Sequence, residues 1–380
     1  MTSSSDGPVG HVLVSPDKFK GSLSAPEVAA HVAAGLRKTR PEVPVLLLPV
    51  ADGGDGTAAA AIAAGYRRVE AEVRGPTGKP VLAALAFSDD TAVVELAEAS
   101  GLTRLPNGRL EPLTATSYGT GQLIAAARRH GARRIVIGLG GSACTDGGAG
   151  MVQALGGRLL DARGDNLPPG GAALRTLHAL DLRGLTDLSG VEVVVASDVD
   201  NPLLGPQGAA AVYGPQKGAS ADDVRVLENG LRRWADLAEA ATRRNARYTA
   251  GAGAAGGVGF ATLAFLGARV EPGIGYLLDL LDFTGKARGA RLVITGEGSL
   301  DTQTLRGKAP IGVARAATRM GVPVVAVAGR RALTGEQMRR ARIQAAYALT
   351  DIEPDVNRCM RQAGPLLEQL VVAVADEWLK

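Results

Sequence analysis

Short runs of β-branched residues alternate with alanine-rich helical stretches in the first part of this chain, and this alternation constrains the fold more than any other feature. The run HVLVS at 11–15 leads to a helix from about Pro26, and VPVLLLPV at 43–50 leads to TAAAAIAAG at 57–65. A strand, a helix and another strand in succession are typical of parallel sheets with crossover helices. The sequence SAPE at 24–27 predicts a capping box that starts the first helix.

The alternation stops near residue 71 and returns near residue 286. Between 69 and 100, strand-like pieces are separated by the turns PTGK and SDD, which predicts an antiparallel meander. Alternation resumes in ARLVITGEG and VPVVAVAGR. We therefore expect an α/β protein of two α/β domains. A discontinuous doubly wound, parallel-sheet (Rossmann-like) domain, 1–70 and 286–380, is interrupted by a second mixed α/β domain, 71–285.

Composition excludes several functional classes. The chain has 42 Lys and Arg against 38 Asp and Glu, and aromatic residues make up 3%. Without a basic block or stacking aromatics, we expect no nucleic-acid partner. Apolar runs stop short of the ~20 residues that a membrane span requires, so we expect no membrane partner. Two cysteines and a start, MTSSSDGPVG, without signal-peptide character favour a cytoplasmic protein.

Five strand-to-helix loops combine an acidic residue with glycine or proline. Any one of them could be an ordinary turn, but together they repeatedly add Lys, Asp, Asn or Gln. In an open α/β sheet such loops gather at the carboxyl edge, where ligands bind. The five loops are SPDKFKGS, VADGGDGT, GLGGSACTDGG, ASDVDNPLLG and TGEGSLDTQTLRGKAP.

The loop GLGGSACTDGG at 138–148 predicts a phosphate cradle, because glycines let backbone N–H groups approach an anion. Within this cradle Asp146 could hold a magnesium-bound water or cap the following helix. The alternative is a tight turn in which Asp146 is only a cap. The segment GAGAAG at 251–256 matches a dinucleotide fingerprint, but a charged helical stretch precedes it instead of a strand. LRGKAP is not a Walker A motif, and Lys308 is equally well explained as a phosphate contact or a lone surface lysine. The predicted nucleotide-binding residues are Gly140, Gly141, Ser142, Thr145, Asp146, Gly147, Gly253, Gly256, Gly257 and Lys308.

Carboxylates at strand ends suit magnesium, which takes hard oxygen ligands and completes its shell with water and phosphate. The candidate ligands are Asp198, Asp200 and Glu297, each with a turn or cap as its alternative. No histidine lies in a glycine-rich loop, so a zinc site or a histidine triad is not expected. Cys144 is interpreted as a packed thiol.

The chain resembles the type I glycerate kinase family over nearly its whole length. The motifs are PDKFKGSLSAPEVA, PVADGGDGT, GLGGSACTDGGAGM, DVDNPLLG, YGPQKGA, GAGAAGGVGF and TGEGSLDTQTLRGKAPIGVA. The resemblance implies two α/β domains with the active site in the cleft between them. It also implies transfer of the ATP γ-phosphate to D-glycerate, usually giving 2-phosphoglycerate, with 3-phosphoglycerate left open. The departures are Lys18 for Ser, Asp55 for Glu, and Cys144-Thr145 for Thr-Asn.

Roles for single residues follow from chemistry and loop position. Phosphoryl transfer requires mainly positioning and charge neutralisation, so ATP and Mg²⁺ are the expected cofactors. We expect the triphosphate on 140–148 and 251–257, magnesium near Asp198, and Asp301 as the acceptor of the substrate hydroxyl proton. The predicted catalytic residues are Asp301, Asp198 and Lys20, and the predicted substrate-binding residues are Asp17, Lys18, Lys20, Asp52 and Asp55.

Two alternatives stay open at this stage. An NAD-dependent sugar-acid oxidoreductase would use GAGAAG, and a non-enzymatic sugar-acid sensor could share the two-domain architecture. The sequence also leaves a homo-oligomer open.

Overall fold

The computed structural model describes residues 10–380, which divide into two compact units. Unit 1 contains the chain up to Asp52, Ala59–Gly65 and Ile274–Lys380, and unit 2 contains Gly53–Ala58 and Tyr66–Gly273. The sequence analysis placed the junctions at 70/71 and 285/286 and assigned 53–58 to the discontinuous domain. The start of the chain, on which the expectation about a signal peptide depends, lies outside the described residues.

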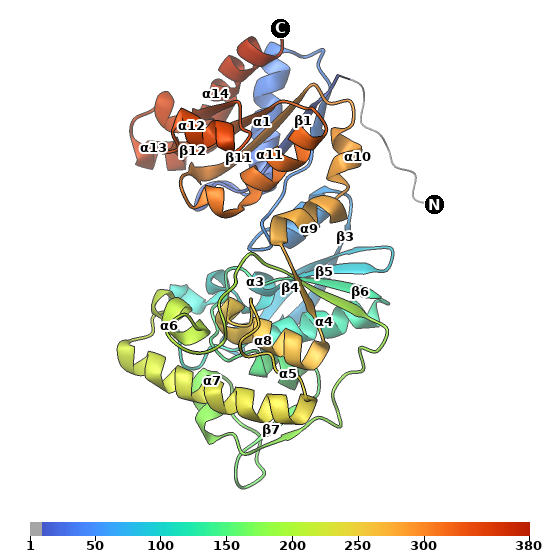
Figure 1. Cartoon of the computed structure of the whole chain (residues 1–380), viewed down its shortest axis with the longest axis vertical. Coiled ribbons are helices and arrows are strands. Elements are labelled where there is room, and N and C mark those ends of the chain that lie inside the picture. The colour runs from blue at the N-terminus through green and yellow to red at the C-terminus, as the bar shows by residue number, and fades with distance from the viewer. Residues whose placement is uncertain (1–9) are drawn as a thin grey trace. The chain divides into compact units, whose positions relative to one another are not determined.

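Unit 1 is built on a five-stranded sheet in which every neighbouring pair is parallel (Figure 1). The strand order is β13-β12-β11-β1-β2, which is 2-1-3-4-5 when the strands are numbered within the unit. This is one of the two common doubly wound orders. The elements are β1 (Val12–Pro16), α1 (Ala25–Thr39), β2 (Val45–Leu47), α9 (Gly273–Leu280), α10 (Phe283–Ala287), β11 (Leu292–Leu300), α11 (Ala309–Arg319), β12 (Val324–Arg331), α12 (Gly335–Arg340), β13 (Ala345–Ala348), α13 (Val356–Arg361) and α14 (Ala363–Trp378). The helix α2 (Thr57–Ala63) has residues in both units, and the first residue of α9, Gly273, belongs to unit 2.

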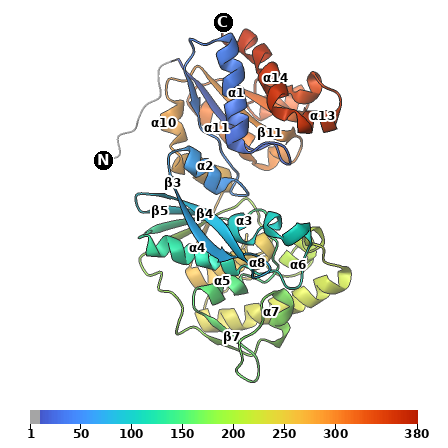
Figure 2. The same cartoon turned by 180° about the vertical axis from the view of Figure 1, so that it is seen from behind.

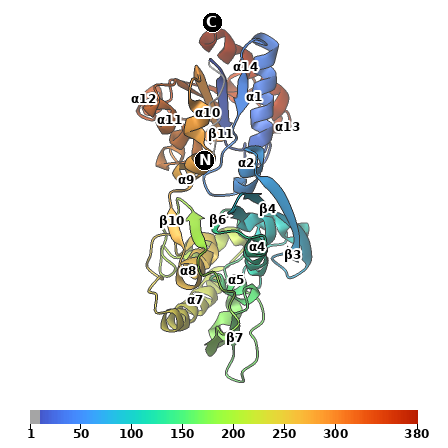
Figure 3. The same cartoon turned by 90° about the vertical axis from the view of Figure 1, so that its right-hand side faces the viewer.

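Helices cover both faces of this sheet. Figure 3 shows α1 and α14 on one side of the strands and α11 and α12 on the other. Val12, Val14 and Ile294 pack into one core with the apolar residues of α1 and α14. A parallel sheet buried on both faces needs continuous apolar strands, which explains runs such as VPVVAVA. The predicted capping box at the start of α1 is confirmed, since Ser24 and Glu27 exchange both hydrogen bonds.

Unit 2 contains a six-stranded mixed sheet in the order β10-β9-β6-β5-β4-β3. The pairs β3–β4 and β4–β5 are antiparallel, which confirms the predicted meander, and α4 packs against these three strands (Figure 2). The strands β5, β6, β9 and β10 are parallel. The elements are β3 (Arg67–Arg74), β4 (Pro80–Ser88), β5 (Thr91–Glu95), α3 (Leu96–Ser100), α4 (Tyr118–Arg129), β6 (Arg134–Gly138), α5 (Ala149–Ala154), β7 (Arg158–Leu160), β8 (Ala179–Asp181), β9 (Glu192–Ala196), α6 (Ala209–Tyr213), α7 (Ala221–Thr242), α8 (Ala254–Leu266) and β10 (Arg269–Glu271).

The most charged stretch of the sequence forms α7. Its apolar stripe, including Leu227, Leu231 and Trp234, is buried, and most of its charged residues lie on the solvated side. Trp234 stacks on Phe265 of α8 with ring centroids 5.1 Å apart. This pairing brings α8 and the glycine-rich segment at its start into the core of unit 2.

No helix within residues 10–380 combines the length and the apolar character needed to cross a membrane.

Candidate active site

The loops that carry the predicted chemistry of unit 2 begin side by side. In the parallel part of its sheet, Glu95 at the end of β5 is in register with Gly138 of β6, and Gly138 is in register with Ala196 of β9. The loop after β6 therefore starts beside the loop after β9, and Glu95 lies next to the end of β6 on its other side. The expected gathering of these loops at the carboxyl edge is confirmed for unit 2.

A buried carboxylate that the sequence analysis missed holds the GGDGT loop. Glu95 is 5% exposed and accepts hydrogen bonds from the backbone N–H groups of Gly56, at 2.9 Å, and Ala58, at 3.0 Å. Burial raises the pKa of Glu95 to about 7, although the two hydrogen bonds oppose the shift. The one local signal is an acidic residue at the end of an otherwise apolar strand, TAVVE.

The glycines of the loop after β6 are required partly by packing of the chain against itself. A Cβ at Gly140 would lie 2.6 Å from the backbone nitrogen of Asp55. Gly141 has φ +67°, and a Cβ there would overlap the Asp55 carboxylate. The predicted substrate residue Asp55 thus lies directly beside the predicted phosphate loop.

The same turn contains backbone donors without a protein acceptor within residues 10–380. Among the described residues, the backbone N–H groups of Gly140, Gly141 and Ser142 donate to no protein acceptor. Buried or half-buried amides are almost always paired, so three consecutive amides without an acceptor indicate a site for an external one. The turn is therefore packed against Asp55 where a Cβ would lie, and three of its amides are left for an acceptor from outside the chain.

Asp146 is committed to the protein itself. It is fully buried, and its carboxylate accepts from the Ser117 amide and hydroxyl, from Thr116, and from the amides of Gly148 and Gly150. These contacts favour the capping alternative for Asp146, since the two glycine amides belong to the start of α5.

The GAGAAG segment connects two loops of the edge. The Gly253 amide donates to the carbonyl of Asn201 at 2.8 Å, and the carbonyl of Gly256 accepts from the Gly147 amide at 3.0 Å. Ala255, Gly256 and Gly257 have successive φ values of 55°, 70° and 91°. The described residues 243–253 contain no strand, so the context of a dinucleotide fingerprint is missing, as the sequence indicated.

Lys217 is a second functional candidate that the sequence analysis passed over. It is 2% exposed, and its Nζ donates to Ser142 Oγ at 2.7 Å and to the carbonyl oxygen of Cys144 at 2.5 Å. Burial lowers its pKa to about 8. Burial raises the pKa of the Cys144 thiol, which agrees with the interpretation of this residue as a packed thiol. The motif YGPQKGA was the only local signal for Lys217.

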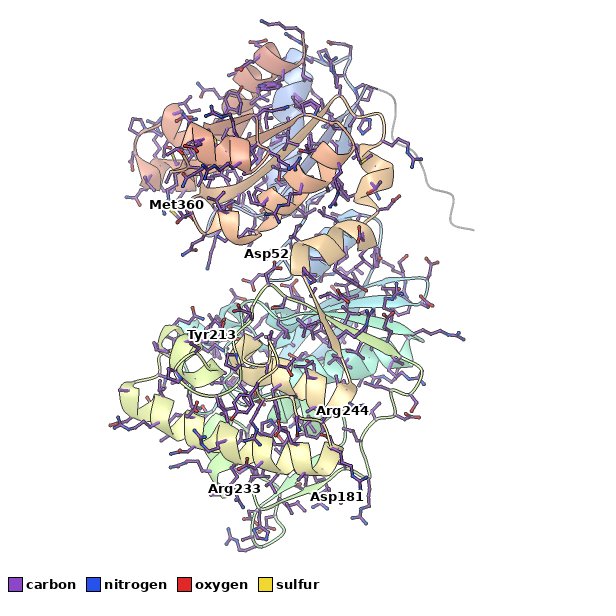
Figure 4. All side chains as sticks on the ribbon, in the orientation of Figure 1. Asp52, Asp181, Tyr213, Arg233, Arg244 and Met360 are labelled. Carbon is purple, nitrogen blue, oxygen red and sulfur yellow. The ribbon has the colours of Figure 1, made fainter. Side chains whose placement is uncertain are left out.

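Asp198 and Asp200 are exposed on the loop after β9. Asp198 Oδ1 accepts from the Gly273 amide at 3.0 Å. The Asn201 side chain donates to the carbonyl of Gln207 and accepts from the hydroxyl of Tyr213, which Figure 4 labels in unit 2. No group of three or more His, Cys, Asp or Glu side chains that could hold a metal exists within residues 10–380. Two neighbouring carboxylates are the number that magnesium takes from a protein when phosphate and water supply the remaining ligands.

Unit 1 has its own carboxyl edge, at the point where the strand order reverses. In a doubly wound sheet, the loops that start here form the usual ligand crevice. Pro16 at the end of β1 is in register with Gly296 of β11, so Asp17 and Glu297 follow at neighbouring positions. Asp52, labelled in Figure 4, follows the adjacent strand β2. A Cβ at Gly298 would lie 3.1 Å from the backbone nitrogen of Lys20. The glycine therefore lets the loop that carries Lys18 and Lys20, here called the lysine loop, approach β11.

The acidic residues of this edge differ in their proton affinity. Asp17 is 7% exposed, and burial, reinforced by the charges of Asp52 and Glu297, raises its pKa to about 7 against the opposing charge of Lys18. Asp301 accepts from the Gln303 amide and the Ser299 hydroxyl, and these bonds lower its pKa. Asp301 therefore has the geometry of a turn carboxylate with low basicity.

Glu297 and Lys308 are engaged with each other. The Glu297 carboxylate accepts from Thr304 Oγ1 at 2.5 Å and from Lys308 Nζ at 3.5 Å, and burial raises its pKa. Both carboxylate oxygens thus have protein partners, which disfavours Glu297 as a metal ligand. Lys308 is half-buried beside this carboxylate, so it is not a lone surface lysine.

The predicted residues thus fall into two groups, one in each unit. Unit 1 contains Asp17, Lys18, Lys20, Asp52, Glu297, Asp301 and Lys308, whereas unit 2 contains Asp55, Gly140, Gly141, Ser142, Thr145, Asp146, Gly147, Asp198, Asp200, Gly253, Gly256 and Gly257.

Comparison with known proteins gives one consistent result. The profile of the glycerate kinase family matches residues 12–379. The chain is 50% identical over 322 residues to glycerate kinase from Bacillus subtilis (strain 168), covering 84% of each chain. It is 46% identical over 323 residues to glycerate 2-kinase from Escherichia coli (strain K12), again covering 84% of each. A solved Salmonella typhimurium LT2 structure assigned as glycerate kinase 2 superposes with a TM-score of 0.82 at 40% identity, covering 98% of this chain and 100% of that chain. With a kinase family matched from β1 to the end of α14, the chain belongs to the glycerate kinase family and is a kinase.

Proposed function

We propose that this kinase transfers the γ-phosphate of ATP to the 2-hydroxyl of D-glycerate, giving 2-phosphoglycerate, with Mg²⁺ bound to the nucleotide. The preference for the 2-hydroxyl is supported by the relative from Escherichia coli named glycerate 2-kinase. Membership in a kinase family favours this reaction over the oxidoreductase and sensor alternatives.

The nucleotide is assigned to unit 2. The observation that carries this assignment is the set of three consecutive amides, of Gly140, Gly141 and Ser142, that lack a protein acceptor. Amides in a row at a glycine turn form a cradle for phosphate oxygens. The segment 255–257 packs against the later part of the same loop, near Cys144, Thr145 and Gly147. Asp55, beside Gly141, is assigned to this loop and not to glycerate.

Asp198 and Asp200 would hold Mg²⁺, since both are exposed at the neighbouring strand end. The donor set fits the ion, because two carboxylates leave the other positions for water and phosphate oxygens. When bound, the ion neutralises charge on the transferring phosphoryl group.

Glycerate is assigned to the edge of unit 1. Lys18 and Lys20 would bind its carboxylate, and Asp52 would accept a hydrogen bond from a hydroxyl group. Asp17 is proposed as the acceptor of the substrate hydroxyl proton, because its pKa of about 7 suits a general base at neutral pH. Asp301 is not proposed for this role, since its carboxylate is held by two donors with a lowered pKa.

The reaction is tested by incubating the protein with D-glycerate and ATP, with and without Mg²⁺, and following the products by phosphorus NMR. We expect the resonances of ADP and one new phosphomonoester resonance, that of a phosphate on a secondary carbon, and only when magnesium is present. A phosphomonoester resonance split by two methylene protons, as in 3-phosphoglycerate, would contradict the assigned position. Turnover at an unchanged rate in the presence of a chelator would show that the reaction does not require magnesium.

Lys20→Ala tests the assignment of glycerate to unit 1. A charge-assisted hydrogen bond to a carboxylate is worth about 1.5–3 kcal/mol, so KM for glycerate should rise roughly 10- to 150-fold. KM for ATP should change little. Lys38→Ala is the matched control, because Lys38 on α1 is exposed and pairs with Glu368 of α14. A rise confined to KM for ATP would assign the lysine loop to the nucleotide instead.

A further inference from the structure

The burial of Lys217 requires an explanation beyond packing. Taking an ammonium group out of water is costly unless it is paired. Among the described residues, its hydrogen bonds go to two neutral oxygens, Ser142 Oγ and the carbonyl of Cys144, and no ion pair includes it. Asp146 is the acidic residue whose charge acts on it, but that carboxylate is occupied by five other donors. Lys217 is therefore a buried cation that contacts the phosphate loop and makes no direct ion pair with any described residue, with the charge of Asp146 acting on it from nearby.

Lys217 also determines which way the Ser142 hydroxyl can act. An ammonium group has hydrogen-bond donors and no acceptor, so the oxygen of Ser142 must accept from it. The hydroxyl hydrogen is then directed away from Nζ. Within residues 10–380 the Ser142 hydroxyl donates to no protein acceptor. Its hydrogen is left for an acceptor that the chain does not supply.

The surroundings hold the ammonium group in place. A Cβ at Gly256 would lie 2.9 Å from Nζ, so the backbone of 255–257 lies close against it. Ala255 adopts φ 55° in this segment, a conformation that costs a non-glycine residue energy. Thr145 Oγ1, on the same loop, is buried without a hydrogen-bond partner. An orphaned hydroxyl on this loop and a buried cation that contacts it both indicate an anionic ligand.

We propose that Lys217 is a positioning residue: its buried ammonium group fixes the Ser142 oxygen as an acceptor and thereby turns the Ser142 hydroxyl hydrogen toward a phosphate oxygen of the nucleotide. This inference rests on the proposed nucleotide site at 140–142. The ligand class is a nucleoside polyphosphate, because the hydroxyl hydrogen and the three free amides belong to three consecutive residues, 140–142, and could serve several phosphate oxygens. The ammonium charge adds attraction for the same anion, and a pKa of about 8 keeps it mostly protonated at pH 7.

A double-mutant cycle tests the coupling. Titration calorimetry with a non-hydrolysable ATP analogue and magnesium is carried out on the wild-type protein, Lys217→Met, Ser142→Ala and the double variant, beside urea unfolding of each. We expect Ser142→Ala to weaken binding by roughly 10- to 100-fold, the value of a hydrogen bond to a charged group. Lys217→Met should weaken it at least as much, and the double variant should bind within about threefold of Lys217→Met. Lys286→Met is the control, since that lysine donates to the carbonyl of Leu281 in unit 1.

The outcomes separate this inference from the proposed nucleotide site. If Ser142→Ala binds the analogue normally, the site itself is misplaced. If Ser142→Ala weakens binding while Lys217→Met does not, or if the two effects multiply, Lys217 does not act through Ser142. A purely structural lysine would lower stability and raise KM for glycerate as much as KM for ATP. If Lys217→Met does not fold, Lys217→Gln is used in its place. The glutamine amide can both donate and accept, so it no longer forces the Ser142 oxygen to accept. We expect Lys217→Gln to weaken binding of the analogue as much as Lys217→Met would.

Discussion

Asp17→Asn is expected to lower kcat by roughly 10²- to 10⁴-fold, the usual contribution of a general base. Asp17 is buried at the end of β1, where Asp52 and Glu297 add negative charge, and its pKa is raised to about 7. The amide has the same shape and can still accept from the Lys18 amide, which now bonds to Asp17 Oδ1 at 2.7 Å. The loss would therefore report proton transfer and not a rearranged loop.

The dependence of kcat/KM on pH tests the same role of Asp17 as a base. A base must be ionised to accept a proton, so kcat/KM of the wild-type enzyme should rise with pH below about 7 and level off above it. In Asp17→Asn the rising limb should disappear from the residual activity. Asp301→Asn is the matched comparison and should retain activity within about tenfold, since Asp301 is a turn carboxylate. The reverse pattern, with Asp301→Asn inactive and Asp17→Asn active, would restore Asp301 as the base.

Asp198→Asn is expected to lower turnover by two orders of magnitude or more at limiting magnesium, because charge stabilisation by a catalytic metal is worth several kcal/mol. The fold should survive, since the amide oxygen can still accept from the Gly273 amide that Asp198 binds at 3.0 Å. Raising the magnesium concentration should recover part of the activity.

The measurement is kcat against magnesium concentration, with urea unfolding as the check on stability. Asp222→Asn is a suitable control, because Asp222 is an exposed aspartate in the first turn of α7. A magnesium dependence identical to that of the wild-type protein would exclude Asp198 as a ligand. Asp200→Asn, measured in parallel, decides whether the second carboxylate of the loop contributes.

The sequence by itself determined the kinds of elements and the loops that carry chemistry. Alternating apolar strands and alanine-rich helices predicted the doubly wound sheet, and the turns PTGK and SDD predicted the meander of β3, β4 and β5. The capping box at Ser24 was predicted as well. Each of these signals involves residues only a few positions apart, so the sequence shows it directly. Strand ends followed by glycine and carboxylates then located the two edges where ligands are expected.

Tertiary structure alone decided what each side chain at those edges does. Lys217 lies 75 positions from Ser142, and Glu95 lies 39 positions from Gly56, so no local pattern could pair them. Asp17 and Asp301 look alike as loop carboxylates, and they differ because one is buried among acidic neighbours while the other is held by donors of its own turn. Gly140 and Gly141 pack against Asp55 where a Cβ would lie, while their amides have no acceptor among the described residues. Both facts depend on which loop packs against the glycines. Burial, pKa values and the direction of a hydrogen-bond donor depend on residues that are far apart in the sequence and close in the fold. Local periodicity therefore does not predict them.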